Sequence, residues 1–224
     1  MRLDRYVSKS LGISRRESKR LILSGRVKVN GRVVKDPSFK VENGKIELDM
    51  EEVEKPKEKI YIMLNKPPGF LSSTSDVEPT VLDLIDHPRV EELHIAGRLD
   101  KDARGLLILT NDGDFTHKII SPRYGIEKEY IVRFEGNPKN IEKLIEGVKS
   151  RGEILKAKCV KLLNENTARI VLTEGKHHEI KRMFSAMGLK VKDIKRVRIG
   201  NLNLDVEEGK WRELSEDEVR KVIG

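Results

Sequence analysis

Several residue types are missing or scarce in this sequence, and each absence excludes a class of protein. The 224 residues include no glutamine and one cysteine, Cys159, which excludes an internal disulfide and a zinc site built from several cysteines. No run of 18 apolar residues occurs, so no membrane contact is expected, and the charged first residues predict no secretory signal. We therefore expect a cytoplasmic protein. The lack of glutamine beside abundant Lys and Glu indicates a thermophilic source.

Three common enzyme motifs are also missing. The chain has no glycine-rich phosphate loop, no G-x-G-x-x-G segment and no G-x-S-x-G elbow, so nucleotide, dinucleotide and acyl-hydrolase sites are not expected. His177, His178 and Glu179 are reminiscent of a metal motif, but its second histidine would fall at position 182, which is Arg. We interpret this segment as a solvent-facing helix start and predict no metal site.

The positive charge is concentrated in the first part of the chain. Of the formal net charge of +8, residues 1–50 contribute a surplus of seven, from 13 Lys and Arg against 6 Asp and Glu. The remaining residues are almost balanced. A local basic surplus of this kind favours a polyanionic partner, most often a nucleic acid, although a basic surface that serves only solubility remains the alternative.

A charged segment with a proline divides the chain. Residues 51–59, EEVEKPKEK, show no apolar periodicity. The sequence therefore predicts a small domain at 1–48, a linker at 49–59 and a larger domain at 60–224.

In the first domain, Ser14 and Glu17 have the spacing of a helix capping box, and Gly25 ends the expected helix. The Asn30-Gly31 pair within RVKVNGRVV predicts a hairpin with a type I′ turn. One face of the helix is expected to carry four cations, which indicate phosphate contacts more than a merely solvated face. These cations are Arg15, Arg16, Lys19 and Arg20.

These features also support a family resemblance. The segment RLDRYVSKSLGISRRESKRLILSGRVKVNG, continuing through Val34, resembles the S-four type RNA-binding domain, which has the alpha-L fold of a ribosomal protein. The resemblance covers nearly the whole first domain. It implies binding to structured RNA and does not imply catalysis.

The second domain is expected to mix strands and helices. Strand patterns outnumber the helices that could connect parallel strands, so we predict an α+β fold with a mixed, mainly antiparallel sheet and flanking helices. The expected strands are 60–64, 105–110, 127–134, 155–163, 167–174 and 191–200. A turn is expected at 111–113, and helices are expected at the start near Thr80, over 138–147, over 177–188 and after Ser215.

Asp100 is the residue whose function the sequence raises most directly. It lies between Gly97 and Gly105, just before the apolar run Leu106–Leu109. Spacing by itself leaves two interpretations open, an aspartate that shapes a turn and a reactive carboxylate at the start of a buried strand. A reactive Asp100 requires a basic neighbour to keep it ionised, and Lys181, beside the apolar stripe of its helix, is the expected partner.

Four segments in order carry a second resemblance. GRLDKDARGLLILTNDG at 97–113 resembles the catalytic motif of the RsuA-type family of RNA pseudouridine synthases, with Ala103 where the family has Thr or Ser. The other segments are NKPPG at 65–69, SPRYGIEKEY at 121–130, and EGKHHEIKRMF at 174–184 with the RIGNLNLD and EGKWREL that follow it.

The resemblance implies an enzyme that isomerises uridine to pseudouridine in ribosomal RNA, without cofactor or metal. It implies Asp100 as the essential carboxylate, Lys181 as its basic partner and Tyr130 as the residue that stacks on a flipped-out uridine. Arg98 and Gly97 are expected to contact the substrate, together with the four cations of the first domain.

Within the family, the C-terminal motif favours the branch that modifies a single uridine of 16S small-subunit rRNA. A synthase acting on 23S rRNA and a non-catalytic RNA-binding assembly factor remain the alternatives. The expected partner is structured ribosomal RNA, free or in an assembly intermediate, and the expected state is a monomer.

Overall fold

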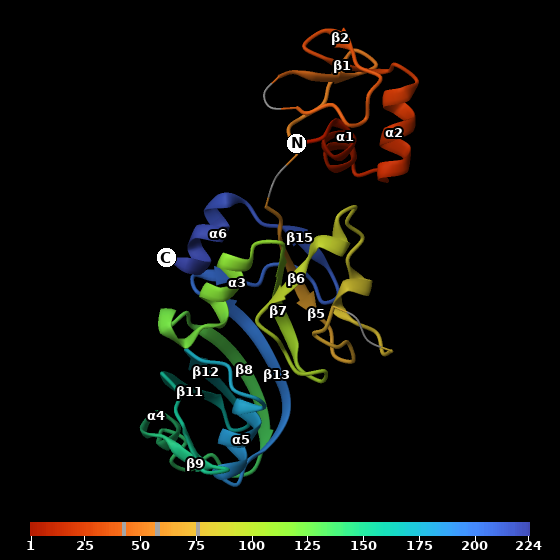
Figure 1. Cartoon of the computed structure of the whole chain (residues 1–224). Coiled ribbons are helices and arrows are strands. Elements are labelled where there is room, and N and C mark those ends of the chain that lie inside the picture. Colours follow the sequence, from red (N-terminus) through yellow and green to blue (C-terminus); the bar gives the residue numbers. More distant parts are fainter. Residues whose placement is uncertain (42–43, 57–58, 75–76) are drawn as a thin grey trace. The chain divides into compact units, whose positions relative to one another are not determined.

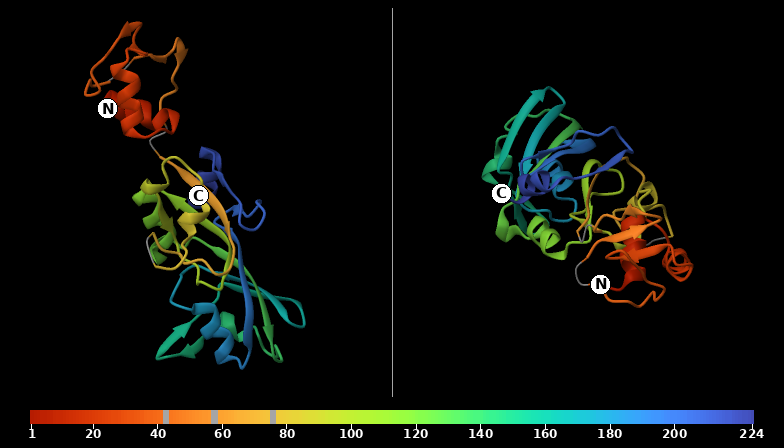
Figure 2. Two further views of the ribbon diagram at one scale, coloured as in Figure 1. Left: turned by 90° about the vertical axis from the view of Figure 1, so that its right-hand side faces the viewer. Right: turned by 90° about the horizontal axis from the view of Figure 1, so that it is seen from above.

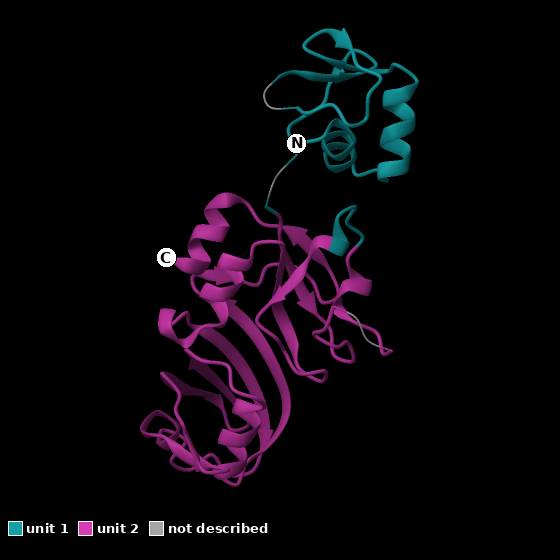
Figure 3. Ribbon diagram, in the orientation of Figure 1, with its two compact units in different colours: residues 1–59, 86–91 teal, residues 60–85, 92–224 magenta. Residues whose placement is uncertain are grey.

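The chain forms two compact units in the computed structural model (Figure 3). The structure describes residues 1–41, 44–56, 59–74 and 77–224. Unit 1 comprises residues 1–59 and 86–91, and unit 2 comprises residues 60–85 and 92–224. None of the helices in these described ranges is long and apolar enough to cross a membrane.

Unit 1 combines two helices with a four-stranded antiparallel sheet of order β2-β1-β3-β4 (Figure 1). The Ser14 hydroxyl accepts the amide of Glu17 at 3.2 Å and so begins α2, as the sequence predicts. Asn30 and Gly31 both have positive φ, 50° and 77°, as the predicted type I′ turn requires. The elements are α1 Leu3–Leu11, which the residue pattern did not predict, α2 Arg15–Leu23, β1 Val27–Val29, β2 Arg32–Val33, β3 Ile46–Leu48 and β4 Glu51–Glu52.

The sheet of unit 1 extends into the segment that the sequence assigns to a linker. β4 pairs with β3, and the buried Val53 donates its amide to Ile46 at 2.8 Å. β4 therefore belongs to the sheet, and the Val53 that follows it is an apolar residue of the unit 1 core, which the charge of the segment does not predict. Residues 57–58 of the predicted linker lie outside the described residues.

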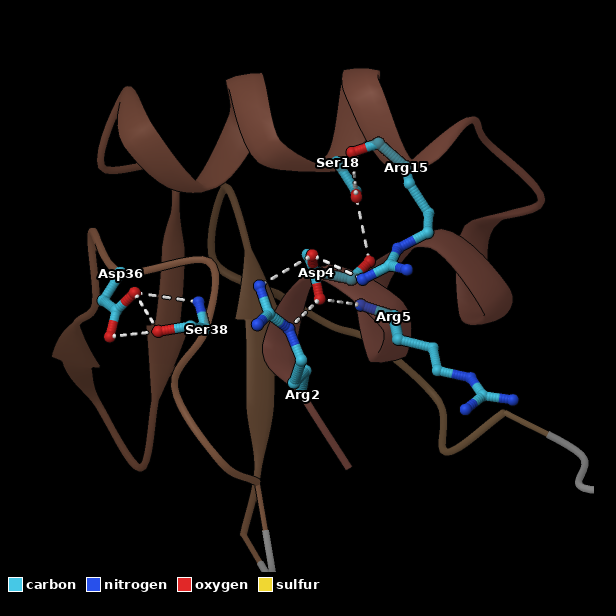
Figure 4. A network of polar contacts seen from close by, with 7 residues as sticks. All are labelled: Arg2, Asp4, Arg5, Arg15, Ser18, Asp36 and Ser38. Carbon is cyan, nitrogen blue, oxygen red and sulfur yellow. Dashed lines mark hydrogen bonds and ion pairs between the residues drawn. The ribbon is translucent and has the colours of Figure 1, made fainter.

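Asp4 is a buried charge that joins the two helices of unit 1 (Figure 4). Its carboxylate accepts from Arg15 at 2.8 Å and from Arg2 at 3.2 Å, and its carbonyl accepts from the Ser18 hydroxyl at 2.9 Å. Burial tends to raise the pKa of Asp4, but the two arginines outweigh burial and hold the pKa below its usual value. Arg15 therefore has a structural partner inside the unit, so its charge is not fully available for contacts with RNA.

Unit 2 is built on one large sheet of order β11-β12-β8-β13-β7-β5-β15, with β14 paired to β13 and β6 paired to β7 (Figures 1 and 2). β13 and β7 run parallel, and every other pairing in this sheet is antiparallel. The predicted mixed, mainly antiparallel α+β sheet is confirmed. Its strands are β5 Tyr61–Lys66, β6 His94–Ala96, β7 Arg104–Thr110, β8 Lys128–Glu135, β11 Cys159–Asn164, β12 Thr167–Leu172, β13 Lys190–Ile199, β14 Leu202–Asn203 and β15 Trp211–Glu213.

The helices of unit 2 follow the sequence prediction in part. The capping boxes at Thr80 and Ser215 both form. Where a turn is predicted at 111–113, Asp112 instead accepts two amides and caps α3, because its carboxylate satisfies the free N–H groups of a helix start. The helices are α3 Gly113–Ile120, α4 Lys143–Glu146, α5 Glu179–Ala186 and α6 Glu216–Ile223, with short 3-10 turns at Val81–Leu84, Val90–Glu92 and Pro122–Tyr124.

The predicted helix at 138–147 is mostly replaced by turns, and a hairpin that the sequence did not predict follows it. The two strands are β9 Val148–Ser150 and β10 Glu153–Leu155, joined by Arg151 and Gly152, both with positive φ. β9 packs against α5, and α5 also packs against β13. The hairpin and the helix therefore form one side of the region that contains Lys181.

The two parallel strands approach each other unusually closely at Gly105. This residue has φ 104°, and a Cβ atom added to it would lie 2.7 Å from the backbone nitrogen of Arg196. Glycine is required here because any side chain would separate the β7–β13 pair. The segment 97–104, which carries Asp100, leads directly into this contact.

Candidate active site

The loop before β7 holds Asp100 in a defined place. The Ser72 hydroxyl donates to the carbonyl of the buried Leu99 at 2.8 Å and accepts its amide at 3.1 Å. Asp100 then accepts the Ala103 amide through its own carbonyl at 3.1 Å. The backbone on both sides of Asp100 is thus hydrogen-bonded, while 27% of the Asp100 side chain stays exposed.

Two cationic or titratable side chains from the start of α5 face the Asp100 carboxylate. Lys181 Nζ lies 3.2 Å from Asp100 Oδ2, and His178 Nε2 lies 3.6 Å from Oδ1. Lys181 also contacts Asp102 at 2.7 Å. Burial works against the charge of Lys181, but hydrogen bonds to Asp102 and Asp100 raise its pKa above the usual value. The ammonium therefore stays charged throughout the neutral pH range.

A small pocket of about 80 Å³ opens at Asp100. Tyr130, 7% exposed, lines this pocket together with Arg98, Asp100 and Lys181, whereas Gly97, which the sequence also proposes for the site, does not. A wider hollow of about 480 Å³ adjoins it and shares Asp100, Arg98, His178 and Lys181. The residues around the pocket are Arg98, Leu99, Asp100, Ala103, Tyr130, Leu172, Gly175, Lys176, His178, Glu179, Ile180, Lys181 and Ile194.

Arg196 connects Tyr130 to the Asp100 loop. Its guanidinium lies 6.0 Å from the centre of the Tyr130 ring, and these two residues are paired across β13 and β8. The same guanidinium donates to the carbonyls of Leu106 at 2.7 Å and Gly97 at 3.2 Å. Arg196 is 2% exposed, so its charge is offset by these carbonyls and by the tyrosine ring. It fixes the aromatic wall relative to the loop.

Lys66 supports the Asp100 loop from inside the unit. The side chain is fully buried, and its ammonium donates to the carbonyls of Ala103 at 2.7 Å, Lys101 at 3.1 Å and Pro67 at 3.1 Å. Burial lowers the pKa of Lys66 to about 8, while Asp102 and Asp100 act in the opposite direction. Lys66 explains why the NKPPG segment accompanies the aspartate segment in the sequence.

Glu179 is a second buried ionisable group at the pocket. It is 4% exposed; Oε2 accepts the Lys176 amide at 3.0 Å, and Oε1 has no hydrogen-bond partner among the described residues. Burial raises the pKa of Glu179 to about 7, opposed by the Lys176 amide and reinforced by the Glu174 carboxylate. Burial likewise lowers the pKa of Lys128 to about 8. Of these two groups, Glu179 lines the pocket, so the pocket contains a carboxyl that titrates near neutral pH.

The residues that the sequence proposes fall into two groups. Asp100, Tyr130, Lys181 and Arg98 line one pocket, and Gly97 has the φ of 87° that favours glycine. The remaining four lie in unit 1 with exposed side chains at the start and middle of α2, where Arg15 is bound to Asp4. They are Arg15, Arg16, Lys19 and Arg20.

Sequence reasoning missed four residues of this site: Lys66, Asp102, His178 and Arg196. The sequence predicts a solvent-facing helix start here, and His178 is indeed the N-cap of α5 with 43% of its side chain exposed, but it also lies beside Asp100 and has a backbone φ of 50°. A histidine in the left-handed region is uncommon, and this strain is a structural signal of a functional position. Lys66 and Arg196 are buried charges, whereas Asp102 is exposed and is recognised by its contact with Lys181. Within the described residues, no cluster of three or more metal-binding side chains occurs.

Comparison with known proteins identifies the family. Residues 60–186 match the model for RNA pseudouridylate synthases, and residues 1–46 match the S4 domain model. The chain belongs to the RNA pseudouridylate synthase family. Asp100, Tyr130 and Lys181 all lie inside the matched segment.

Relatives match this family member along its whole length. An uncharacterized RNA pseudouridine synthase of Aquifex aeolicus is 46% identical, covering 99% of this chain and 96% of the relative. The ribosomal small subunit pseudouridine synthase A of Vibrio parahaemolyticus is 43% identical, covering 99% of both, and that of Escherichia coli is 37% identical, covering 100% of both. A crystal structure of a pseudouridylate synthase superimposes with a TM-score of 0.70 at 35% identity, covering 100% of both chains.

Proposed function

We propose that this pseudouridine synthase isomerises a single uridine of 16S rRNA and uses Asp100 as its essential carboxylate. The observation that carries the proposal is the Asp100–Lys181 ion pair, at 3.2 Å, in a pocket walled by Tyr130. The choice of 16S rRNA is supported by full-length relatives named ribosomal small subunit pseudouridine synthase A.

The reaction breaks the bond from ribose to the base nitrogen, rotates the base and joins ribose to carbon 5. Asp100 must be ionised to attack the nucleotide or to take a proton from its sugar. Lys181 favours the ionised form because it is a fixed positive charge beside the carboxylate. The bond from Lys181 to Asp102 holds the ammonium in place while Asp100 reacts.

The target uridine has to leave its helix before it can react, because the sugar and both faces of the base must be reached. Tyr130 is positioned by Arg196 and stacks on the flipped base, a contact worth about 1–3 kcal/mol. Arg98 is exposed at the mouth of the pocket and contacts the phosphate or fills the space that the base vacates.

We propose that the RNA-binding domain extends through Val53, past the predicted boundary at 48, that the chain after it leads to the catalytic domain at 60–224, and that the four cations of α2 contact RNA phosphates. We expect the enzyme to act as a monomer. An rRNA substrate, free or in an assembly intermediate, supports action in the cytoplasm.

Tritium release from RNA labelled at carbon 5 of uridine tests the proposal. We expect release from 16S rRNA and none from 23S rRNA, with complete loss in Asp100→Asn. Release from 23S rRNA alone would keep the enzyme and change its substrate. No release from either RNA, including 16S rRNA bound by small-subunit proteins, would favour a non-catalytic assembly factor.

A further inference from the structure

A third hollow lies beside the two that contain Asp100. It measures about 360 Å³ and shares His178 and Lys181 with the site of Asp100. Its other walls come from the β9–β10 hairpin and from the outer side of α5, neither of which has a role in the proposed reaction. The lining residues are Lys149, Ser150, Arg151, His178, Lys181, Arg182, Ser185 and Ala186.

The hollow is lined by cations and hydroxyls and by no carboxylate. Lys149 and Arg151 are exposed, and neither forms an ion pair or side-chain hydrogen bond in the part of the chain that the structure describes. Glu153 stands close by, but it is bound to Arg182 at 2.7 Å, and Lys181 is bound to Asp100 and Asp102. The uncompensated charge of the hollow is therefore that of Lys149 and Arg151.

Arg182 gives the hollow a fixed shape. Only 12% of its side chain is exposed, and it donates to the Ser150 carbonyl at 3.0 Å as well as to Glu153. These bonds join α5 to the hairpin. Arg151 follows at the hairpin turn, where its φ of 52° and the following Gly152 at 82° set a tight type I′ turn. The bonds of Arg182 therefore hold in place the hairpin that carries Lys149 and Arg151.

We propose that this hollow binds a backbone phosphate of the RNA next to the target uridine. Lysine, arginine and serine donors together are the usual protein groups for a nucleic-acid phosphate, and they fix register without reading sequence. His178 and Lys181 line both the pocket at Asp100 and this hollow, so the two adjoin each other. A nucleotide whose base enters the pocket at Asp100 therefore has a neighbouring backbone phosphate close to the hollow, and a phosphate fits the positive charge of Lys149 and Arg151. This inference rests on the proposed function.

The test compares two double variants of equal charge. Lys149→Ala with Arg151→Ala removes the free cations of the hollow, and Lys156→Ala with Lys161→Ala removes two exposed lysines outside it. Tritium release from the RNA substrate is measured as kcat and KM over a range of salt concentrations. For the hollow variant we expect KM to rise about tenfold at low salt with kcat within twofold of wild type. The slope of log KM against log salt should fall by about 0.7 per lost phosphate contact.

Equal changes in both double variants would overturn the inference, and so would a fall in kcat with KM unchanged. If the wild-type chain releases no tritium, the proposed function fails, and equilibrium binding of the same RNA decides the inference separately. Weaker binding with a smaller salt slope in the hollow variant, and not in its control, then supports a phosphate site. Identical binding curves reject it.

Discussion

At the scale of single residues, the site at Asp100 includes a buried cation as well as the charged groups that line its pocket. Lys181 is shared between Asp100 and Asp102, and the buried Lys66 holds the backbone around them through three carbonyls. The arrangement separates two tasks. Lys66 sets where the loop lies, and Lys181 sets the charge of the reacting carboxylate.

Replacing Lys181 tests the second task. We expect Lys181→Met to lower kcat by about 10²–10³-fold because a preorganised charge beside the reacting group is lost. Lys181→Arg keeps the positive charge and should retain most of the activity. The measurement is single-turnover tritium release at saturating RNA. Equal losses in the two variants would show that the shape of the lysine matters and its charge does not.

The buried Glu179 gives a pH prediction at the same scale. Its ordinary pKa of 4.5 rises to about 7 in the folded chain, so the folded state binds more protons than the unfolded state between these values. The contribution of Glu179 to the free energy of unfolding therefore falls as pH rises from about 4.5 to about 7. Above that range the folded chain contains an ionised, buried carboxylate.

Glu179→Gln replaces the carboxyl with an amide that does not titrate. Relative to wild type, we expect the variant to be more stable by about 1–3 kcal/mol at pH 8 and nearly unchanged at pH 4.5. Urea unfolding at the two pH values measures the difference, and Glu142→Gln, which changes an exposed carboxyl, serves as control. A stability difference that is the same at both pH values would falsify the assignment.

At the scale of elements, the parallel contact of β7 and β13 assembles the site. β7 follows the Asp100 loop directly, and β13 carries Arg196 and follows α5, which carries Lys181. Arg196 is paired with Gly105 of β7 on one side and with Tyr130 of β8 on the other. These three paired residues set the distance between the Asp100 loop and Tyr130. Their pairing depends on the absence of a side chain at position 105.

Gly105→Ala should therefore disrupt the site and the sheet together. The added Cβ would lie 2.7 Å from the Arg196 nitrogen at a φ of 104°, so we expect a loss of at least about 3 kcal/mol in the free energy of unfolding. Gly113→Ala is the matched control, since nothing lies within 4 Å of its Cβ position in α3. We expect the control to change stability by no more than about 1 kcal/mol in urea. Similar unfolding midpoints for both variants would contradict this account.

At the scale of the whole molecule, we expect unit 1 to supply RNA affinity and unit 2 to supply the chemistry. Unit 1 has most of the net positive charge, and the pocket lies entirely in unit 2. Three of the four predicted cations of α2, Arg16, Lys19 and Arg20, are exposed and make no ion pair within the described residues. Arg15 differs because it is bound to the buried Asp4.

A variant with Arg16, Lys19 and Arg20 all changed to Ala tests this division. We expect KM for RNA to rise at least tenfold and the salt slope of log KM to fall by about two, with kcat at saturating RNA unchanged. Arg15→Ala should behave differently and lower the thermal midpoint, since it removes a partner of a buried carboxylate. Loss of kcat in the triple variant would mean that unit 1 also shapes the pocket.

The sequence by itself determined the features that depend on neighbouring residues. The Asn30-Gly31 turn, the caps at Ser14, Thr80 and Ser215, and the alternating strand β8 all formed because turns, caps and strand faces are set within a few residues. The GRLD segment and the three other matching segments indicated the family for a related reason, since each motif is a short run of neighbouring residues.

Only the tertiary structure decided which distant side chains meet. The Lys181–Asp100 pair was expected from the sequence, but the approach of His178 to Asp100 follows from the parallel β7–β13 contact and the packing of α5, which no local pattern encodes. The same holds for Lys66 and Arg196, whose buried charges are stabilised by carbonyls of remote loops. Hydrogen bonding across the sheet can satisfy a buried cation, whereas residue type and periodicity predict that it stays outside.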